Sequence, residues 1–132
     1  AYSSIIKIRL ADILLLKAEA MIQTDDLAGA ATIINQIRSR AKLPELTAND
    51  KSSKDNLMKA YLKERRLELA FEGQRWFDLV RLDKVEEVMN AVYAKDSGRR
   101  PQVYQFNEYS YRLAIPQTIL DQNPNLVQNM GY

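Results

Sequence analysis

The sequence has no cysteine and no histidine among its 132 residues. Disulfide bonds, thiolate nucleophiles, Cys/His zinc sites and Ser-His-Asp triads are therefore excluded within this chain. Glycine and proline are scarce, at four each, which excludes collagen-like and linker-like material. The formal net charge is only +2, and no glycine-rich phosphate loop is present. We therefore expect no cofactor, and the sequence does not support a nucleotide or nucleic-acid ligand.

The length and composition are those of one globular domain, or a large piece of one. Hydrophobic residues make up 46% and charged residues 27% of the chain, so it can bury a sizeable core. Residues 5–22 are apolar, but five charged side chains interrupt them, and each costs about 3 kcal/mol at a bilayer centre. We interpret this stretch as an amphipathic helix. The chain begins almost directly on it without a signal peptide, so we expect a fragment of a longer protein.

Apolar residues recur every three or four positions in two stretches, as on one face of a helix. Residues 24–26 offer capping side chains between the two helices, and Pro44 ends the second one. Because about four polar residues join them, the helices must pack antiparallel, with Ala18 and Ala30 allowing close approach. The two predicted faces are Ile6, Leu10, Ile13, Leu14, Ala18 and Met21, and Ala30, Ile33, Ile34, Ile37 and Ala41.

The rest of the chain predicts further helices and then an irregular tail. Ser52 or Ser53 can cap a third helix, and Gly73 is expected to end or kink it. A fourth helix is predicted to reach about residue 81 and a short one to follow over 84–94, before an exposed loop over 95–102. Alternating residues predict a strand or extended segment over 109–115, followed by at most a turn of helix near 118–120. The predicted fold is all-α.

Residues 64–81 hold the densest charge in the chain. A glycosidase would need two carboxylates facing each other across roughly 5–10 Å, whereas neighbours on one helix line the same wall. An adjacent arginine also lowers a carboxyl pKa, the wrong direction for a general acid. We interpret the run as a structural ion-pair network. The possible i,i+3 pairs are Arg65–Glu68, Glu72–Arg75, Arg75–Asp78 and Asp78–Arg81.

Residues 121–125 superficially resemble the start of a calcium loop. Leu126 and Tyr132 stand where such a loop needs Gly and Glu, so we expect no metal site. The Asn and Asp side chains are expected instead to bond nearby backbone and hold an extended tail.

Arginines and aromatic residues are interleaved over residues 99–111. Such side chains can contact sugar rings or stack on single-stranded nucleic acid. Equally, loop arginines can be solvated and alternating tyrosines half-buried. Trp76 likewise is either a core residue or an exposed ligand platform. If the chain has a ligand surface, we expect it over residues 93–111, with Arg100, Tyr104, Phe106 and Tyr109 as ligand-binding residues.

Four ordered motifs stand out in the sequence. Residues 64–81 read Glu-Arg-Arg-x-Glu-Leu-Ala-Phe-Glu-Gly-x-Arg-Trp-Phe-Asp-Leu-x-Arg. The others are residues 9–20, which end in Ala-Glu-Ala, residues 35–44, which end in Leu-Pro, and the closing segments 115–117 and 121–132. Together these motifs resemble the SusD/RagB family, the surface glycan-binding lipoproteins of Bacteroidetes outer membranes, and residues 64–81 are similar to its signature. The resemblance implies a framework role for Glu64, Arg65, Arg66, Glu68, Glu72, Arg75, Trp76, Asp78 and Arg81.

The resemblance also implies a fold and a function. The chain would be the C-terminal portion of a larger protein, a single domain over residues 1–132. It would have tetratricopeptide-like antiparallel helix pairs over about 5–94, then a loop and extended tail over about 95–132. It would bind an oligosaccharide or polysaccharide without catalysis and deliver it to a SusC-like TonB-dependent transporter. A lipid anchor on an upstream cysteine would hold it at the outer-membrane surface.

Two other functions remain as alternatives at this point. A tetratricopeptide-like scaffold could bind a protein or peptide partner, provided that a helix surface exposes polar groups ready for a ligand. A carbohydrate-active enzyme is disfavoured by the arrangement of the carboxylates along one helix.

Overall fold

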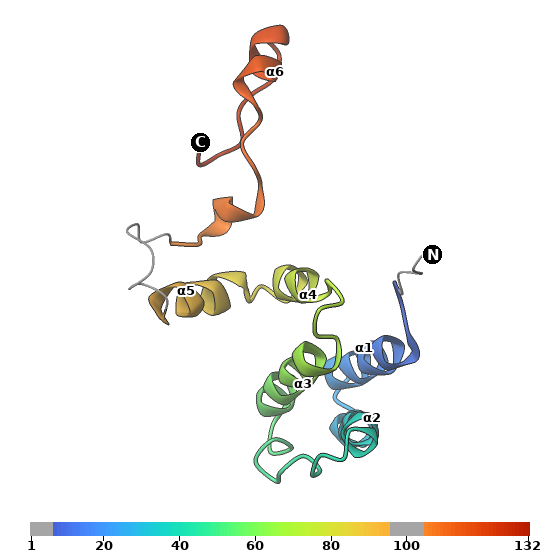
Figure 1. The fold of residues 1–132 in the computed structure, drawn as a ribbon. Coiled ribbons are helices and arrows are strands. Elements are labelled where there is room, and N and C mark those ends of the chain that lie inside the picture. The colour runs from blue at the N-terminus through green and yellow to red at the C-terminus, as the bar shows by residue number, and fades with distance from the viewer. Residues whose placement is uncertain (1–6, 96–104) are drawn as a thin grey trace. The chain divides into compact units, whose positions relative to one another are not determined.

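The computed structural model describes residues 7–95 and 105–132, and within them all regular structure is helical (Figure 1). The all-α class predicted from the sequence is therefore confirmed. The chain divides into two compact units, Ala1–Arg75 and Trp76–Tyr132. The expectation of a single domain over residues 1–132 stays a prediction.

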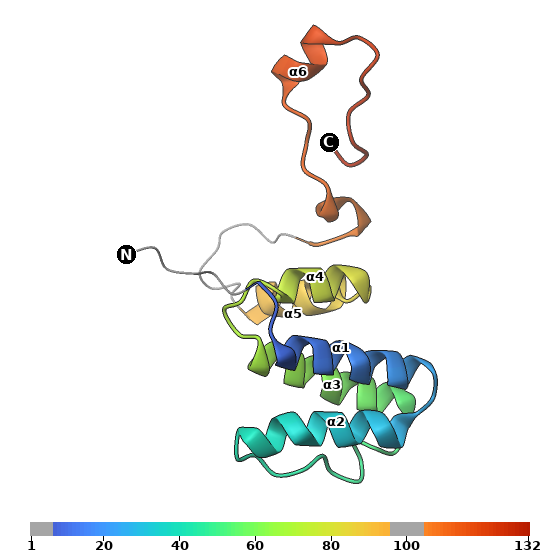
Figure 2. The same cartoon turned by 90° about the vertical axis from the view of Figure 1, so that its right-hand side faces the viewer.

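Three helices form the first unit: α1 (Leu10–Gln23), α2 (Leu27–Arg40) and α3 (Lys54–Glu68). Each helix contacts the other two, and the three lie side by side (Figure 2). The short turn over residues 24–26 makes α1 and α2 antiparallel neighbours, as predicted. Ala18 and Ala30 are fully buried, as close approach of the two helices requires.

Local side chains set where α2 and α3 begin. Asp26 caps α2 by accepting a hydrogen bond from Gly29 N at 2.9 Å, and Ser53 caps α3 by accepting from Asn56 N at 3.2 Å. Each cap satisfies a backbone donor that the first helical turn leaves unpaired, a stabilisation of about 1 kcal/mol. The predicted beginning of the first helix is wrong within the described residues, because 7–9 are not helical and Arg9 is extended.

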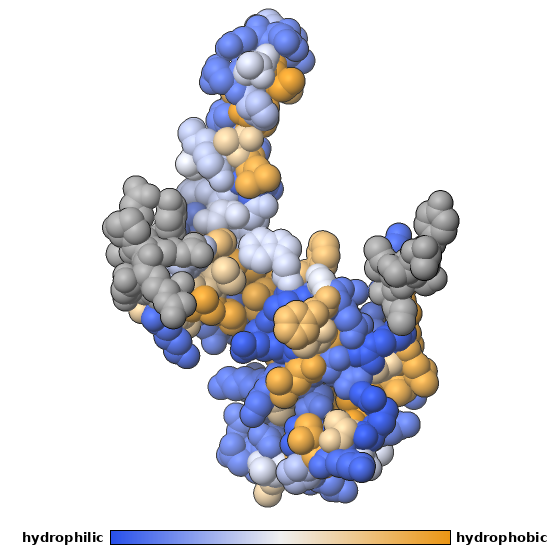
Figure 3. Space-filling view, viewed as in Figure 1, coloured by the Kyte–Doolittle hydropathy of each residue, from blue (hydrophilic) through white to orange (hydrophobic). Residues whose placement is uncertain are grey.

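The buried face of α1 also differs from the predicted face. Leu10 and Ile13 are 73% and 51% exposed. Residues 13–16 are all apolar, so the periodicity admits more than one face, and packing against α2 and α3 selects one of them. Apolar residues that do not face the core therefore appear on the surface (Figure 3). No helix in residues 7–95 or 105–132 has the length and apolar character needed to cross a membrane. The apolar residues that α1 buries are Ala11, Leu15, Ala18 and Ile22.

The second unit contains short helices: α4 (Arg75–Arg81), which begins at the boundary, α5 (Val85–Lys95), the 3-10 helix η1 (Glu108–Tyr111) and α6 (Gln117–Gln122). The ends of α4 and α5 agree with the prediction, and α6 is the predicted turn near 118–120. The prediction that Gly73 ends or kinks the third helix is wrong, because α3 already ends at Glu68 and Gly73 lies in the connection that follows, with φ at +78°.

The strand or extended segment predicted over 109–115 is wrong for residues 109–111, which belong to η1. Asn107 Oδ1 accepts a hydrogen bond from Tyr109 N at 3.0 Å, and Ser110 Oγ accepts from Asn107 N at 3.1 Å. This reciprocal capping stabilises a helical turn locally and outweighs the alternation of side chains. The backbone is extended again at Arg112, with φ −117° and ψ 136°.

Candidate functional site

Four aromatic rings of the second unit form one group, which we call the aromatic cluster: Trp76, Tyr93, Phe106 and Tyr111. Phe106 stacks on Tyr93 with ring centroids 5.5 Å apart and an interplanar angle of 17°. Trp76 meets Phe106 edge-on at 6.4 Å and Tyr111 in a tilted arrangement at 6.5 Å. Trp76 keeps 39% of its surface exposed, so the interpretation of this residue as a core side chain is wrong.

Helix α5 holds the backbone of Phe106 in place through hydrogen bonds from one side chain. Asn90 Oδ1 accepts a hydrogen bond from Phe106 N at 2.7 Å, and Asn90 Nδ2 donates to Phe106 O at 3.0 Å. Asn90 and Tyr93 are three residues apart on α5 and therefore share a helix face. One face of α5 thus supplies an amide for the Phe106 backbone and a ring for its side chain.

Helix η1 brings a second set of side chains around a cavity of about 380 Å³. Its lining residues are Glu108, Tyr109, Tyr111, Arg112 and Met130, and we call it the η1 cavity. Tyr111 belongs to both the aromatic cluster and this cavity. The volume lies within the range of small-molecule sites, roughly 300–1,000 Å³.

Side-chain bonds fold the C-terminal tail back along this segment. Gln128 accepts a hydrogen bond from Ile115 N at 2.8 Å and donates to Ile115 O at 2.9 Å. The Tyr132 hydroxyl donates to Arg112 O at 2.9 Å. Asn123 accepts from Asn125 N at 3.1 Å, so the predicted bonding of tail side chains to nearby backbone is confirmed.

Gly131 packs against Tyr109 in a way that other residues cannot. A Cβ atom at position 131 would lie 2.6 Å from Tyr109 Cβ, and the φ angle there is +100°. Both the space and the backbone conformation therefore require glycine. The neighbouring Met130 lines the η1 cavity.

The two tyrosines of the η1 cavity stay protonated at neutral pH. The hydrogen bond and negative charge of Glu108 raise the pKa of Tyr109. Loss of hydration, followed by the charges of Asp83 and Glu86, raises the pKa of Tyr111. A raised pKa is the opposite of what a phenolate nucleophile needs. Each phenol instead offers an aromatic face together with a hydroxyl that can donate and accept.

The predicted ligand-binding residues fall partly inside the described structure. Tyr109 lines the η1 cavity and Phe106 belongs to the aromatic cluster, and Tyr111 joins these two features. Arg100 and Tyr104 lie outside the described residues. Tyr111 belonged to the aromatic run but was not predicted as a contact.

Glu108, Arg112 and Met130 were not predicted as site residues. Glu108 and Arg112 flank the tyrosines of η1, so their position next to the aromatic run could have indicated them from the sequence. No sequence feature indicates Met130, because it reaches the η1 cavity only when the tail folds back.

The signature residues connect helices of the first unit. Arg65 bonds Asp12 at 2.9 Å, with side chains only 2% and 9% exposed. Arg38 bonds the buried carboxylate of Glu64 at 2.7 Å. Tyr61, just before the signature, donates to Glu19. These contacts join α3 to α1 and α2 and support the framework interpretation.

Glu68 and Glu72 have partners other than those expected from helical spacing. Glu68 bonds Arg9 at 2.5 Å and Arg40 at 2.6 Å, so the predicted pair with Arg65 is wrong. Glu72 bonds Arg9 at 2.8 Å, which displaces the predicted pair with Arg75. The hydrogen bonds from Arg9 lower the pKa of Glu72, and those to Glu72 and Glu68 raise the pKa of Arg9.

The remaining signature residues surround α4 or are exposed. The predicted i,i+3 pair between Asp78 and Arg81 forms at 2.8 Å, with the Asp78 carboxylate buried. Arg75 is half-buried and Arg66 is exposed. Within residues 7–95 and 105–132, no group of three acidic side chains is arranged to hold a metal ion.

Comparison with known sequences places the chain among SusD-like proteins. The model of the SusD family matches residues 2–132. SusD-like protein P38 of Formosa agariphila is 38% identical over 136 residues, and SusD-like protein P2 of the same organism is 34% identical over 136 residues. These alignments cover 98% and 96% of this chain, but 25% and 26% of the relatives. The chain therefore spans about a quarter of the length of the curated relatives it matches.

Solved structures show the same fold. A SusD superfamily protein from Bacteroides vulgatus aligns with a TM-score of 0.73 and 28% identity, over 96% of this chain and 27% of that one. A SusD-like protein from Bacteroides fragilis aligns with a TM-score of 0.72 and 31% identity, over 97% of this chain and 26% of that one. The all-helical arrangement and the tetratricopeptide-like pairing agree with these structures.

Proposed function

Because the chain belongs to the SusD family, we propose that it is part of a protein that binds oligosaccharides or polysaccharides without catalysing a reaction on them. The observation that carries the proposal is the η1 cavity, where two tyrosines lie beside a carboxylate and a guanidinium. A sugar ring has apolar C–H faces and a rim of hydroxyls. The tyrosines of the cavity suit the apolar faces, and the charged side chains suit the hydroxyls. The aromatic faces cover the ring, while Glu108 and Arg112 accept from and donate to its hydroxyls.

The ligand surface extends from the η1 cavity to the aromatic cluster. Tyr109 and Tyr111 are the central contacts, and Phe106 with Trp76 continues the aromatic surface beside them. Arg100 and Tyr104 remain proposed ligand-binding residues from the sequence.

Family membership also supports a proposal for the whole protein. It binds the glycan at the cell surface, anchored to the outer membrane by a lipid, and passes it to a SusC-like TonB-dependent transporter. In this arrangement the chain touches the membrane only through an anchor outside its own residues, and nucleic acid is not a partner.

The test is retention of the chain in affinity gels that contain soluble polysaccharides of different chemistry, followed by calorimetry with the polysaccharide that retards it. We expect Tyr109→Ala and Tyr111→Ala each to weaken binding about fivefold, because losing about 40 Å² of apolar contact costs about 1 kcal/mol. Phe71→Ala is the matched control, since Phe71 is an aromatic side chain of the first unit that is completely exposed. Equal retention of all three variants and the parent chain would remove the η1 cavity as the binding site.

A further inference from the structure

One side of α1 is apolar although it is exposed. Leu10, Ile13 and Leu16 keep 73%, 51% and 41% of their surface exposed. Positions 10, 13, 17 and 20 follow the spacing of a helix, so they form one stripe, which rises about 15 Å along the axis. We call this stripe the α1 outer face, and its residues are Leu10, Ile13, Leu16, Lys17 and Ala20.

The acidic residues of α1 are engaged on its other side, within the first unit. Asp12 is buried and bonds Arg65 at 2.9 Å, and Glu19 accepts a hydrogen bond from Tyr61. Both carboxylates are therefore directed at α3. Lys17 is the one charged residue that the sequence of α1 places on the outer face. A helix that is apolar on nearly all sides is typical of the interior of a protein.

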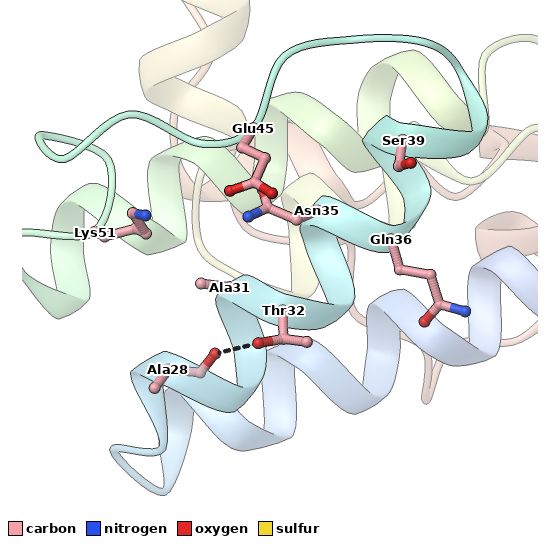
Figure 4. A pocket seen from close by; sticks show the side chains of 8 residues that line it. All are labelled: Ala28, Ala31, Thr32, Asn35, Gln36, Ser39, Glu45 and Lys51. Atoms are coloured by element: carbon pink, nitrogen blue, oxygen red, sulfur yellow. Dashed lines mark hydrogen bonds between the residues drawn. The ribbon is translucent and has the colours of Figure 1, made fainter.

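The other two helices of the first unit expose polar side chains instead. On α2, Thr32, Gln36 and Ser39 are exposed, and the Thr32 hydroxyl donates to Ala28 O at 3.0 Å (Figure 4). Helix α3 exposes charged side chains, with one leucine among them. These two helices are suited to contact with water, whereas α1 is not. The exposed residues of α3 are Asp55, Lys59, Lys63, Arg66 and Leu67.

The length of the relatives indicates what covers the α1 outer face. The chain spans 25% of SusD-like protein P38 and 26% of SusD-like protein P2, so most of each relative lies outside the matching region. Helix pairs of the tetratricopeptide kind stack on one another, and each pair buries an apolar side against its neighbour. A further helix of the same polypeptide is therefore the occupant that this architecture favours.

A second copy of the chain does not suit the outer face. Two α1 helices that cover residues 10–20 of each other, in either direction, bring Lys17 within about one helical turn of its own copy. Like charges placed together in an apolar contact oppose association. Lys17 instead favours a different helix, one that carries a carboxylate at this level.

We propose that the α1 outer face binds an α-helix from the part of the complete polypeptide that lies outside these 132 residues. That helix packs apolar side chains, spaced three and four residues apart, against Leu10, Ile13 and Leu16. The small side chain of Ala20 marks the point of closest approach, and a carboxylate of the incoming helix meets Lys17. The proposal is independent of glycan binding, because none of these residues belongs to the η1 cavity or the aromatic cluster.

The absence of cysteine from the chain makes thiol labelling a direct test. Ile13→Cys and the control Thr32→Cys are each introduced into the complete polypeptide, and the modified peptide is quantified by mass spectrometry after treatment with N-ethylmaleimide. Each rate is compared with the rate in urea. We expect Ile13→Cys to be protected about tenfold or more and Thr32→Cys to react freely, because thiol reactivity follows access.

The 132-residue chain alone supplies the converse measurement. There Ile13→Cys should react about as fast as Thr32→Cys, since both positions are exposed. Equal rates at the two positions in the complete polypeptide would overturn the proposal. Protection of Ile13→Cys in the isolated chain that increases with protein concentration would also overturn it, since it would assign the face to a second copy.

The charge of Lys17 gives a second readout in the complete polypeptide. Lys17→Glu should lower the urea midpoint, because it places two carboxylates together between packed helices. Lys59→Glu is the matched control, since it makes the same change at an exposed position of α3. If both substitutions change the midpoint equally, no acidic helix lies against the α1 outer face and the proposal fails.

Discussion

Replacing Asp12 by Asn tests whether the buried ion pair with Arg65 holds α1 against α3. The two groups are 2.9 Å apart and their side chains are 9% and 2% exposed. Asn keeps the shape of Asp and removes its charge, so the guanidinium of Arg65 stays buried without its carboxylate. The change therefore isolates the electrostatic part of the contact.

The expected magnitude follows from burial. At an effective dielectric constant near 20, two unit charges at this distance attract by about 6 kcal/mol, and their loss of hydration offsets part of this. Breaking a buried pair at one end costs roughly 3–5 kcal/mol. Since Arg65 has further interactions, we expect the lower end, a loss of about 3 kcal/mol in the free energy of unfolding.

Asp25→Asn is the matched control, because Asp25 forms an exposed ion pair with Lys54 at 3.0 Å and its side chain is 75% exposed. Such a pair contributes about 1 kcal/mol or less. Asn also tolerates the positive φ of Asp25, +64°. The control thus changes the same chemical group without leaving a buried charge.

Urea unfolding followed by far-UV circular dichroism measures these differences, provided that the m-value is unchanged. The double variant Asp12→Leu with Arg65→Met should recover most of the loss, since it removes both buried charges. If Asp12→Asn destabilises the chain no more than Asp25→Asn does, the buried pair is not what holds α1 and α3 together.

Two further predictions concern the ion pair of Glu72 with Arg9 and the packing of the C-terminal tail on Tyr109. The hydrogen bonds from Arg9 lower the pKa of Glu72, so its contribution to stability is present above the ordinary glutamate pKa of about 4.3 and is lost as the pH falls through the lower folded-state value. Glu72→Gln should therefore flatten the fall of the urea midpoint as the pH is lowered below about 4.3. A pH profile parallel to that of the parent chain would contradict this. Gly131→Ala should accelerate amide hydrogen exchange over residues 128–132, because its Cβ would meet Tyr109, whereas Gly73→Ala shares the positive φ but has no atom within 4 Å of the added Cβ. Similar acceleration around both sites would mean that backbone strain, and not the contact with Tyr109, governs the tail.

For much of the candidate site, the sequence predicted a region of the chain but not the individual residues. The run of aromatic residues indicated residues 93–111, and Tyr109 does line the η1 cavity. Met130 reaches the same cavity only because Gln128 binds Ile115 and Gly131 packs on Tyr109. Contacts of this kind join separated segments and leave no periodic pattern in the sequence.

The sequence by itself determined the helical class and the antiparallel pairing of α1 with α2, and it limited the helix caps to residues 24–26 and to Ser52 or Ser53, of which the structure uses Asp26 and Ser53. These features depend on residues within a few positions of one another, where side-chain spacing and capping chemistry act directly. Only the tertiary structure decided which face of α1 is buried and that Asp12 pairs with Arg65, 53 residues away. A charge at an interior position is stable only when a distant partner meets it there, and that partner is chosen by how the helices pack.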